Sequence, residues 1–193
     1  RTNDGLWRTH DLKAGLEQIL NDGIALLEAD MGNIRVLNSE SGTLEILAQR
    51  GFGPDFLEYF RTVSPEENSA WGRSFRSGKR VVIEDVNVDP DYAPYRAAAE
   101  RAGYRSVQST PLLGSNGKLI GVFSTHFREP HRLFEPELLW LDLNANRAAQ
   151  FIERVRTEER LQRATRAIMA AREENNREVA RELHDVFSQE LVA

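Results

Sequence analysis

The chain of 193 residues contains no cysteine. Without a thiol it forms no disulfide and no thiolate zinc site, and it offers neither a thiol nucleophile nor an attachment point for a thioether-linked chromophore. The absence fits a reducing compartment, so we expect a cytoplasmic location.

Long apolar runs are also absent, and basic residues are too few to dominate. No run approaches the ~20 residues that a bilayer-spanning helix needs, and no signal peptide is visible, so we expect no membrane contact. With 25 Lys and Arg against 30 Asp and Glu, the net charge is -5, which disfavours a dedicated nucleic-acid binder. The chain begins at Arg1 and ends inside a helical pattern, so we expect it to be a piece of a longer protein.

Glycine and proline are both missing between Glu137 and Ala193. With Pro136 suited to a first helical position, this stretch predicts one helix about 85 Å long, which would extend beyond a compact domain. We expect the early part to pack on the domain through its apolar side chains, which are Leu138, Leu139, Leu141, Leu143, Phe151 and Ile152.

The later part of this helix repeats a spacing of three and four residues that is diluted by polar side chains. The positions are Leu161, Thr165, Ile168, Arg172, Asn175 and Val179. This pattern favours a dimeric coiled coil, although a solvated helix without a partner is the alternative.

The rest of the sequence predicts an α+β fold, an antiparallel sheet with helices inserted between its strands. Expected helices are Leu12–Ala29, Phe56–Phe60, Ser69–Arg76 ending at Gly78, and Tyr92–Ala102 ending at Gly103. Expected strands are Asn33–Leu37, Thr43–Arg50, Val81–Ile83, Ser106–Leu112 and Lys118–Phe127.

One short segment near the end of the chain could carry chemistry. On a helix, His184 points away from the apolar stripe of Val179, Leu183 and Val186. The neighbouring Asp185 could accept a hydrogen bond from one ring nitrogen and leave the other free to attack the γ-phosphate of ATP. From spacing alone, an ordinary surface histidine is the simpler interpretation.

The segment from Arg181 to Gln189 resembles the phosphoacceptor helix of nitrate-sensor-type histidine kinases, whose pattern is Arg-Glu-Leu-His-Asp, three residues and Gln. The resemblance implies that His184 accepts the phosphoryl group, that Asp185 polarises it, and that Gln189 positions water when the response regulator is dephosphorylated. It also implies ATP as a cofactor, a homodimer, and a response regulator as partner. The ATP-binding domain would follow Ala193, so we expect this chain alone to be inactive as a kinase.

Residues 12–156 resemble a GAF sensor domain. The resemblance lies in Ala29–Asn33, Ser69–Arg73, Val82–Val86, Ser109–Leu112, Leu119–Val122 and Ser124–Phe127 through Phe134. It implies a GAF-like antiparallel sheet with helices on both faces, terminal helices on one and a pocket on the other. Residues 157–176 would then form a coiled-coil linker, and residues 177–193 would begin the dimerisation and phosphoacceptor helix.

The candidate pocket residues are Trp71, Phe75, Tyr92, Tyr95, Tyr104 and Arg105. Arg105 could meet an acidic ligand, whereas the aromatic residues could equally fill the core. Neither His126 nor His131 has a second ligand at metal spacing, so we expect no metal site. The resemblance leaves the small-molecule ligand of the pocket unknown.

Together these features predict a sensor histidine kinase of a two-component system, in which a GAF domain controls phosphorylation of His184 through a helical linker. The alternatives are a small-molecule-binding or dimerisation module without phosphotransfer, and a coiled-coil scaffold.

Overall fold

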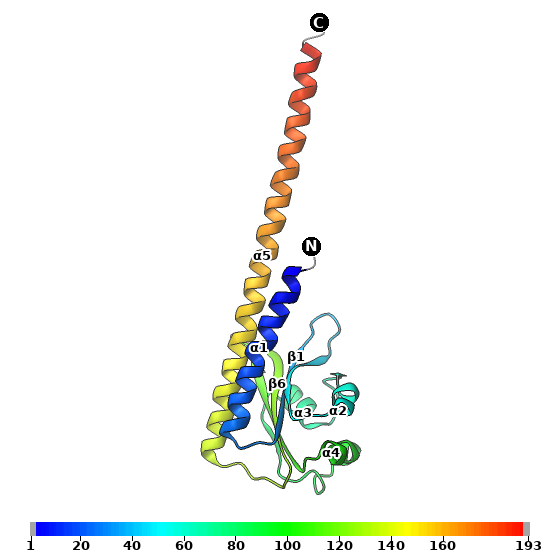
Figure 1. Cartoon of the computed structure of the whole chain (residues 1–193), viewed down its shortest axis with the longest axis vertical. Coiled ribbons are helices and arrows are strands. Elements are labelled where there is room, and N and C mark those ends of the chain that lie inside the picture. The colour runs from blue at the N-terminus through cyan, green and yellow to red at the C-terminus, as the bar shows by residue number, and fades with distance from the viewer. Residues whose placement is uncertain (1–2, 191–193) are drawn as a thin grey trace. The chain divides into compact units, whose positions relative to one another are not determined.

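The computed structural model describes the backbone of residues 3–190 and the side chains of residues 12–181. The chain divides into two units, residues 1–153 and residues 154–193. The elements are α1 (Asn3–Leu26), β1 (Met31–Leu37), β2 (Leu44–Arg50), α2 (Pro54–Tyr59), β3 (Thr62–Val63), α3 (Ala70–Ser77), β4 (Val81–Ile83), the 3-10 helix η1 (Ala93–Tyr95), α4 (Arg96–Ala102), β5 (Ser106–Leu113), β6 (Leu119–Phe127) and α5 (Glu135–Glu190) (Figure 1).

A six-stranded sheet in the order β3-β2-β1-β6-β5-β4 forms the centre of the first unit. Every pair of neighbouring strands is antiparallel, which confirms the predicted sheet. The sequence did not predict β3, because two residues are too few to show an alternating pattern.

Helix α1 and the first part of α5 cover one face of the sheet (Figure 1). Their buried side chains include Leu16, Leu20, Ile24, Leu141, Ala145, Ala148 and Ile152, which meet Ile34, Val36, Leu112 and Phe123 from the strands. This apolar layer confirms the expectation that the terminal helices share one face.

The short helices α2, α3 and α4 cover the opposite face, which we call the pocket face. Ser69 caps α3 by accepting a hydrogen bond from the Gly72 N–H, and Gly78 ends it with a φ of 64°. The expected helix Tyr92–Ala102 instead starts with the 3-10 turn η1 before α4 begins at Arg96. Such tighter turns are frequent at helix N-termini.

The long C-terminal helix is confirmed as α5, but its early apolar residues do not all pack on the sheet. Leu141 is fully buried, whereas Leu139 is 71% and Leu143 47% exposed. At about 100° per residue, Leu139 and Leu143 share the side of the helix opposite Leu141. The expectation that all of these residues pack inward was therefore wrong, because one helix buries only one stripe against a sheet.

The second unit consists of the C-terminal part of α5. Leu161, Ile168, Met169 and Val179 are all exposed on it. Ion pairs one turn apart, such as Arg163–Glu159 and Arg177–Glu173, lie along the same stretch. The dimeric coiled coil remains a prediction. Among the described helices, none combines the length and apolar character needed to span a membrane.

Gly121 permits the close approach of β6 to β1, and we predict that Gly121→Ala destabilises the fold. A Cβ atom there would lie 2.2 Å from the backbone oxygen of Arg35, so a strand would have to shift. We expect the free energy of unfolding, measured by urea denaturation, to fall by about 1–3 kcal/mol.

Gly53→Ala is the matched control, since the described part of the chain places no other heavy atom within 4 Å of a Cβ at that position. Because Gly53 is the N-cap residue of α2, alanine there should cost at most about 1 kcal/mol, less than at position 121. Equal urea midpoints for the two variants would contradict the packing argument.

Candidate ligand-binding site

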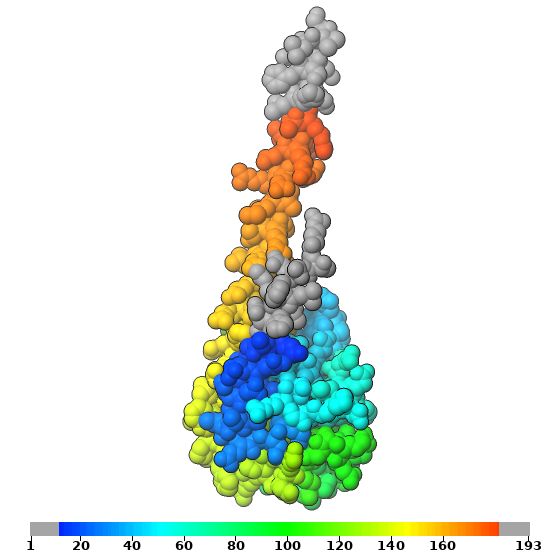
Figure 2. Space-filling model, viewed as in Figure 1, coloured from blue at the N-terminus to red at the C-terminus, as the bar shows by residue number. Residues whose placement is uncertain are grey.

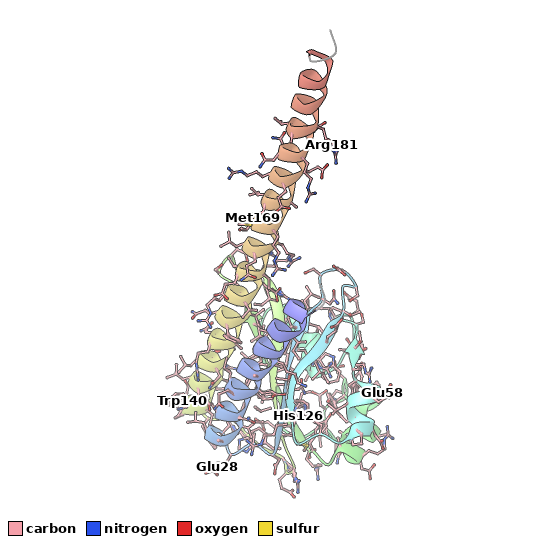
Figure 3. All side chains as sticks on the ribbon, turned by 45° about the horizontal axis from the view of Figure 1, so that its top comes forward. Glu28, Glu58, His126, Trp140, Met169 and Arg181 are labelled. Atoms are coloured by element: carbon pink, nitrogen blue, oxygen red, sulfur yellow. The ribbon has the colours of Figure 1, made fainter. Side chains whose placement is uncertain are left out.

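The pocket face of the sheet carries buried polar side chains among its apolar ones. Strand alternation places Asn33 and Arg35 of β1 on this face beside Ser124 and His126 of β6. All four side chains have no exposed surface. Figure 3 shows His126 in the interior of the first unit, in contrast to Glu58 at its surface. Buried polar groups normally have hydrogen-bond partners, so the partners of these residues decide what the face does.

Arg35 is a buried cation, and only one of its three guanidinium nitrogens has a hydrogen-bond partner among the described residues. Its guanidinium carbon lies 4.6 Å from the centre of the Trp71 ring, and its Nη1 donates to the Phe60 carbonyl at 2.8 Å. Its Nε and Nη2 atoms have no hydrogen-bond partner among the described residues, and we call this pair of atoms the open edge of Arg35.

Burial lowers the pKa of Arg35 to about 10, and the nearby Glu67, Tyr104 and Tyr92 limit the shift. The guanidinium therefore keeps its charge at neutral pH. Glu67 uses its Oε1 to accept a hydrogen bond from the Ser64 N–H at 3.2 Å.

His126 lies between aromatic rings. Its ring centre is 4.7 Å from that of Tyr104 and 4.9 Å from that of Phe52, both in edge-on arrangements. Within the described part of the chain, neither ring nitrogen has a hydrogen-bond partner. Burial, and then the charge of Arg35, lowers the pKa of His126 to about 3, so the imidazole is neutral.

Helix α3 and two tyrosines complete the polar set. Trp71 Nε1 and Ser74 Oγ on α3, like both amide atoms of Asn33, have no partner among the side chains and backbone that the structure describes. The hydroxyls of Tyr92 and Tyr104 bond to each other at 2.9 Å. Each unsatisfied buried group costs about 1–3 kcal/mol, so their gathering on one face favours a binding role over simple packing.

A surface groove between α2 and α4 lies next to these polar residues. It has a cavity volume of about 180 Å³ and is lined by Gly53, Pro54, Asp55, Phe56, Tyr59, Phe60, Ala98, Arg101 and Ala102. In Figure 2 the cyan surface of α2 adjoins the green surface of α4. Phe56 lies 6.4 Å from Tyr104 and Phe60 lies 5.1 Å from Trp71, between ring centres. These two phenylalanines separate the groove from the Arg35 cluster.

The structure brings the aromatic candidates together. Trp71, Tyr92 and Tyr104 are buried in one cluster under the inserted helices, and Phe75 and Tyr95 pack against its edge. Their roles as ligand contacts remain predictions.

Arg105 lies apart from this cluster. Because neighbouring residues of an extended chain point to opposite sides, Tyr104 faces inward and Arg105 outward. The Arg105 Nε donates to Asp85 Oδ1 at 3.0 Å, and this pairing lowers the pKa of Asp85. The structure thus assigns Arg105 a carboxylate partner within the protein, and the cation at the cluster is Arg35.

Sequence reasoning missed Arg35 and Asn33, and it considered His126 only as a metal ligand. In the sequence, polar residues alternate with Ile34 and Val36, which is typical of a strand with one solvated face. What the sequence did not show is that β1 is a central strand, and a central strand covered on both faces buries its polar residues too.

The remaining candidates lie on the far part of α5. The backbone of this helix extends to Glu190 and so includes His184, Asp185 and Gln189. Their side chains lie outside the described residues, and their roles remain predictions.

Comparisons with known proteins agree with this architecture. The family model described as GAF domain matches residues 9–153. A methyl sulfide methyltransferase-associated sensor of Methanosarcina acetivorans is 31% identical over 90 residues, which cover 47% of this chain and 9% of that protein.

Two solved structures show the same fold. A domain assigned to a two-component sensor histidine kinase of Sinorhizobium meliloti is 23% identical, with a TM-score of 0.64 and coverage of 76% of this chain and 93% of that one. The GAF domain region of a protein from Geobacter sulfurreducens, assigned as a membrane protein, is 21% identical, with a TM-score of 0.67 and coverage of 78% and 99%. At these identities the likeness shows the fold alone.

The neutral state of His126 predicts a loss of stability in acid. Its pKa is about 3 in the folded chain and about 6.5 when unfolded, so between these values the unfolded chain binds one more proton. The free energy of unfolding should therefore fall as the pH decreases from about 6.5, by up to about 1.4 kcal/mol per pH unit. Above pH 6.5 or so, His126 adds no pH dependence.

His126→Gln removes this titration and is the variant to compare with wild type by urea denaturation at about pH 7 and about pH 5. The wild type should lose about 2 kcal/mol more than the variant over this interval. His131→Gln, which alters a partly exposed loop histidine, should retain the wild-type loss. Parallel pH profiles for wild type and His126→Gln would show that His126 takes up its proton as readily in the folded chain as in the unfolded one.

Proposed function

The chain belongs to the GAF domain family, and on that premise we propose that it is the sensory and phosphoacceptor part of a two-component histidine kinase. The GAF sensor domain would take up a signal at the pocket face. Helix α5 would carry that signal to His184, which would accept a phosphoryl group from ATP bound elsewhere in the longer protein and pass it to a response regulator.

The observation that carries the signalling part of this proposal is the position of Arg80. It follows α3 in the chain, and its Nη2 donates to the Leu138 carbonyl at 2.9 Å and pairs with Asp142, both on α5. Its Nε donates to Thr110 Oγ1 of β5 at 3.0 Å. The Arg80 side chain therefore connects the segment that follows α3 with β5 and with the start of α5.

The hydrogen bonds continue from Arg80 into the sheet. Thr110 donates to Gln108 Oε1 at 2.9 Å, and Gln108 Nε2 donates to Thr125 Oγ1 at 3.1 Å. Coupling between sites needs such contiguous contacts and an element with two arrangements. A ligand that moves Trp71 on α3 would change the contacts of Arg80 with Leu138 and Asp142 on α5. Helix α5 continues without a break to the His184 motif.

The phosphoacceptor role rests on the motif from Arg181 to Gln189, which lies on α5. The structural likeness to a domain assigned to a sensor histidine kinase supports the same context. On a helix exposed to solvent, a neutral imidazole beside a carboxylate can act as a nucleophile towards a γ-phosphate.

The proposal includes a homodimer. In the first unit, Leu139, Trp140 and Leu143 form an exposed apolar patch on α5. Exposed apolar patches commonly mark protein interfaces, and the diluted seam predicted on the later part of α5 suits a second copy of the same helix. The patch would serve a dimerisation module without phosphotransfer equally well, so chemistry has to separate the two functions.

We predict that the longer protein containing this chain forms an acid-labile phosphohistidine from radiolabelled ATP, and that His184→Gln abolishes it. Glutamine preserves the helix and lacks a nucleophilic nitrogen. His131→Gln should label like the wild type. Equal labelling of wild type and His184→Gln would exclude the kinase assignment and favour the module without phosphotransfer.

We also predict that Arg80→Gln loosens the start of α5 in the 193-residue chain. Losing its bonds to Leu138 and Asp142 should cost about 1–2 kcal/mol locally. Backbone amides in the first turns of α5 should exchange with deuterium roughly tenfold faster, whereas those of α1 should not.

Arg132→Gln is the control, because that arginine is 77% exposed and its ion pair with Glu84 is long, at 3.8 Å. If it accelerated exchange in α5 as much as Arg80→Gln does, Arg80 would have no special hold on the helix.

A further inference from the structure

The charge of Arg35 identifies the kind of molecule that would complete the pocket. An uncompensated charge in a protein interior costs several kcal/mol. Within the described chain, the compensation of Arg35 consists of the Phe60 carbonyl, the face of Trp71 and the more distant Glu67. None of these is an anion bonded to the open edge. An anion from solution would therefore supply the missing hydrogen-bond acceptors and compensate the charge of Arg35.

The shape of the open edge selects among anions. Nε and Nη2 of a guanidinium lie on one side of a planar fork, where they match two oxygens of a carboxylate in a bidentate pair. Trp71 Nε1, which can only donate, provides a further donor in contact with Arg35.

The charge of the surroundings favours a single negative charge on the ligand. Among the described residues, Arg35 is the one fully buried Lys or Arg. His126 adds no second charge, because its imidazole is neutral. With the more distant Glu67 already near Arg35, a monoanionic carboxylate therefore fits better than a phosphate dianion, which would add about one further negative charge to the site.

The aromatic side chains between the groove and Arg35 favour an apolar body on that carboxylate. Phe52 and Phe56 stack at 4.0 Å, and Phe60 continues the row at 4.7 Å from Phe56. The adjoining groove, at about 180 Å³, is smaller than the ~300 Å³ or more of sites for drug-sized ligands, which limits the ligand to a small molecule.

Phe60 connects the entrance to the anchor. Its ring separates the groove from the cluster, and its carbonyl accepts the hydrogen bond from Arg35. It is also the C-terminal cap of α2, a helix of 6 residues. Movement of the Phe56 and Phe60 rings with this short helix would open a path from the groove to the open edge.

From these observations we infer that the GAF pocket binds a small carboxylate with an apolar body, anchored by Nε and Nη2 of Arg35 and admitted between α2 and α4. The inference rests on the proposed sensory function and names the ligand class of its site.

Isothermal titration calorimetry on the 193-residue chain tests it with three probes, isobutyrate, benzoate and phenylacetate, each beside its amide. At least one carboxylate should bind at millimolar concentration, and its amide should bind on the order of tenfold more weakly or worse, because it lacks the charge. Arg35→Met should weaken carboxylate binding on the order of tenfold or more. Arg105→Gln should stay within about twofold of wild type, because Arg105 is paired with Asp85.

Two outcomes would overturn the inference: no heat from any of the three carboxylates, or amides that bind as well as the acids. Arg35→Lys is a second variant, in case the methionine variant does not fold. It retains the positive charge but loses the planar guanidinium, so it should bind the carboxylate more weakly than wild type. Retained affinity in both Arg35 variants would also refute the anchor.

The proposed function and the ligand inference can fail independently, and the two failures are distinguishable. Carboxylate binding without any labelling of His184 in the longer protein would leave a ligand-binding module. Labelling of His184 without carboxylate binding would leave a kinase whose sensor takes another ligand.

Discussion

The structure depends on a guanidinium that is held inside the sheet without a bonded anion in the described chain. Arg35 receives the face of Trp71 from α3 and the carbonyl of Phe60 from the end of α2, so two of the three covering helices are arranged around it. An apolar side chain of similar length would avoid the desolvation cost. A chain selected only for stability would have little use for this arrangement, whereas a chain that must recognise a charged molecule requires it.

The two faces of the sheet differ in the side chains that they bury. The face under α1 and α5 is filled mainly by apolar side chains and forms one of the two hydrophobic core clusters. The pocket face carries the unsatisfied polar groups. Because the same strands supply both faces in alternation, a shift of a strand would move side chains on both faces. Arg80 supplies a second connection at the edge, where Thr110 of the sheet and Asp142 of α5 meet it.

The elements were largely predictable because each rests on local chemistry. Gly78 and Gly103 ended helices at positive φ, as the sequence indicated, and the Gly114–Gly117 turn joined the two longest strands. The buried site was harder, because it depends on strand order. Whether Arg35 faces solvent or core depends on β1 lying between β2 and β6 under a layer of helices, and no local pattern contains that information. Arg105 was the more visible cation in the sequence, but Asp85 lies next to it only after folding.

Helix α5 is constrained on two sides in the first unit, which bears on how a signal could leave the domain. Leu141 fixes one stripe in the core, while Leu139 and Leu143 lie exposed on the other. A second copy that covered the exposed stripe would be pressed against the same helix turns that Arg80 holds through Leu138 and Asp142. A change in that hold would then alter the packing between copies rather than the helix itself. Under the proposed function, a small change at the pocket would in this way reach the start of the helix that carries the His184 motif.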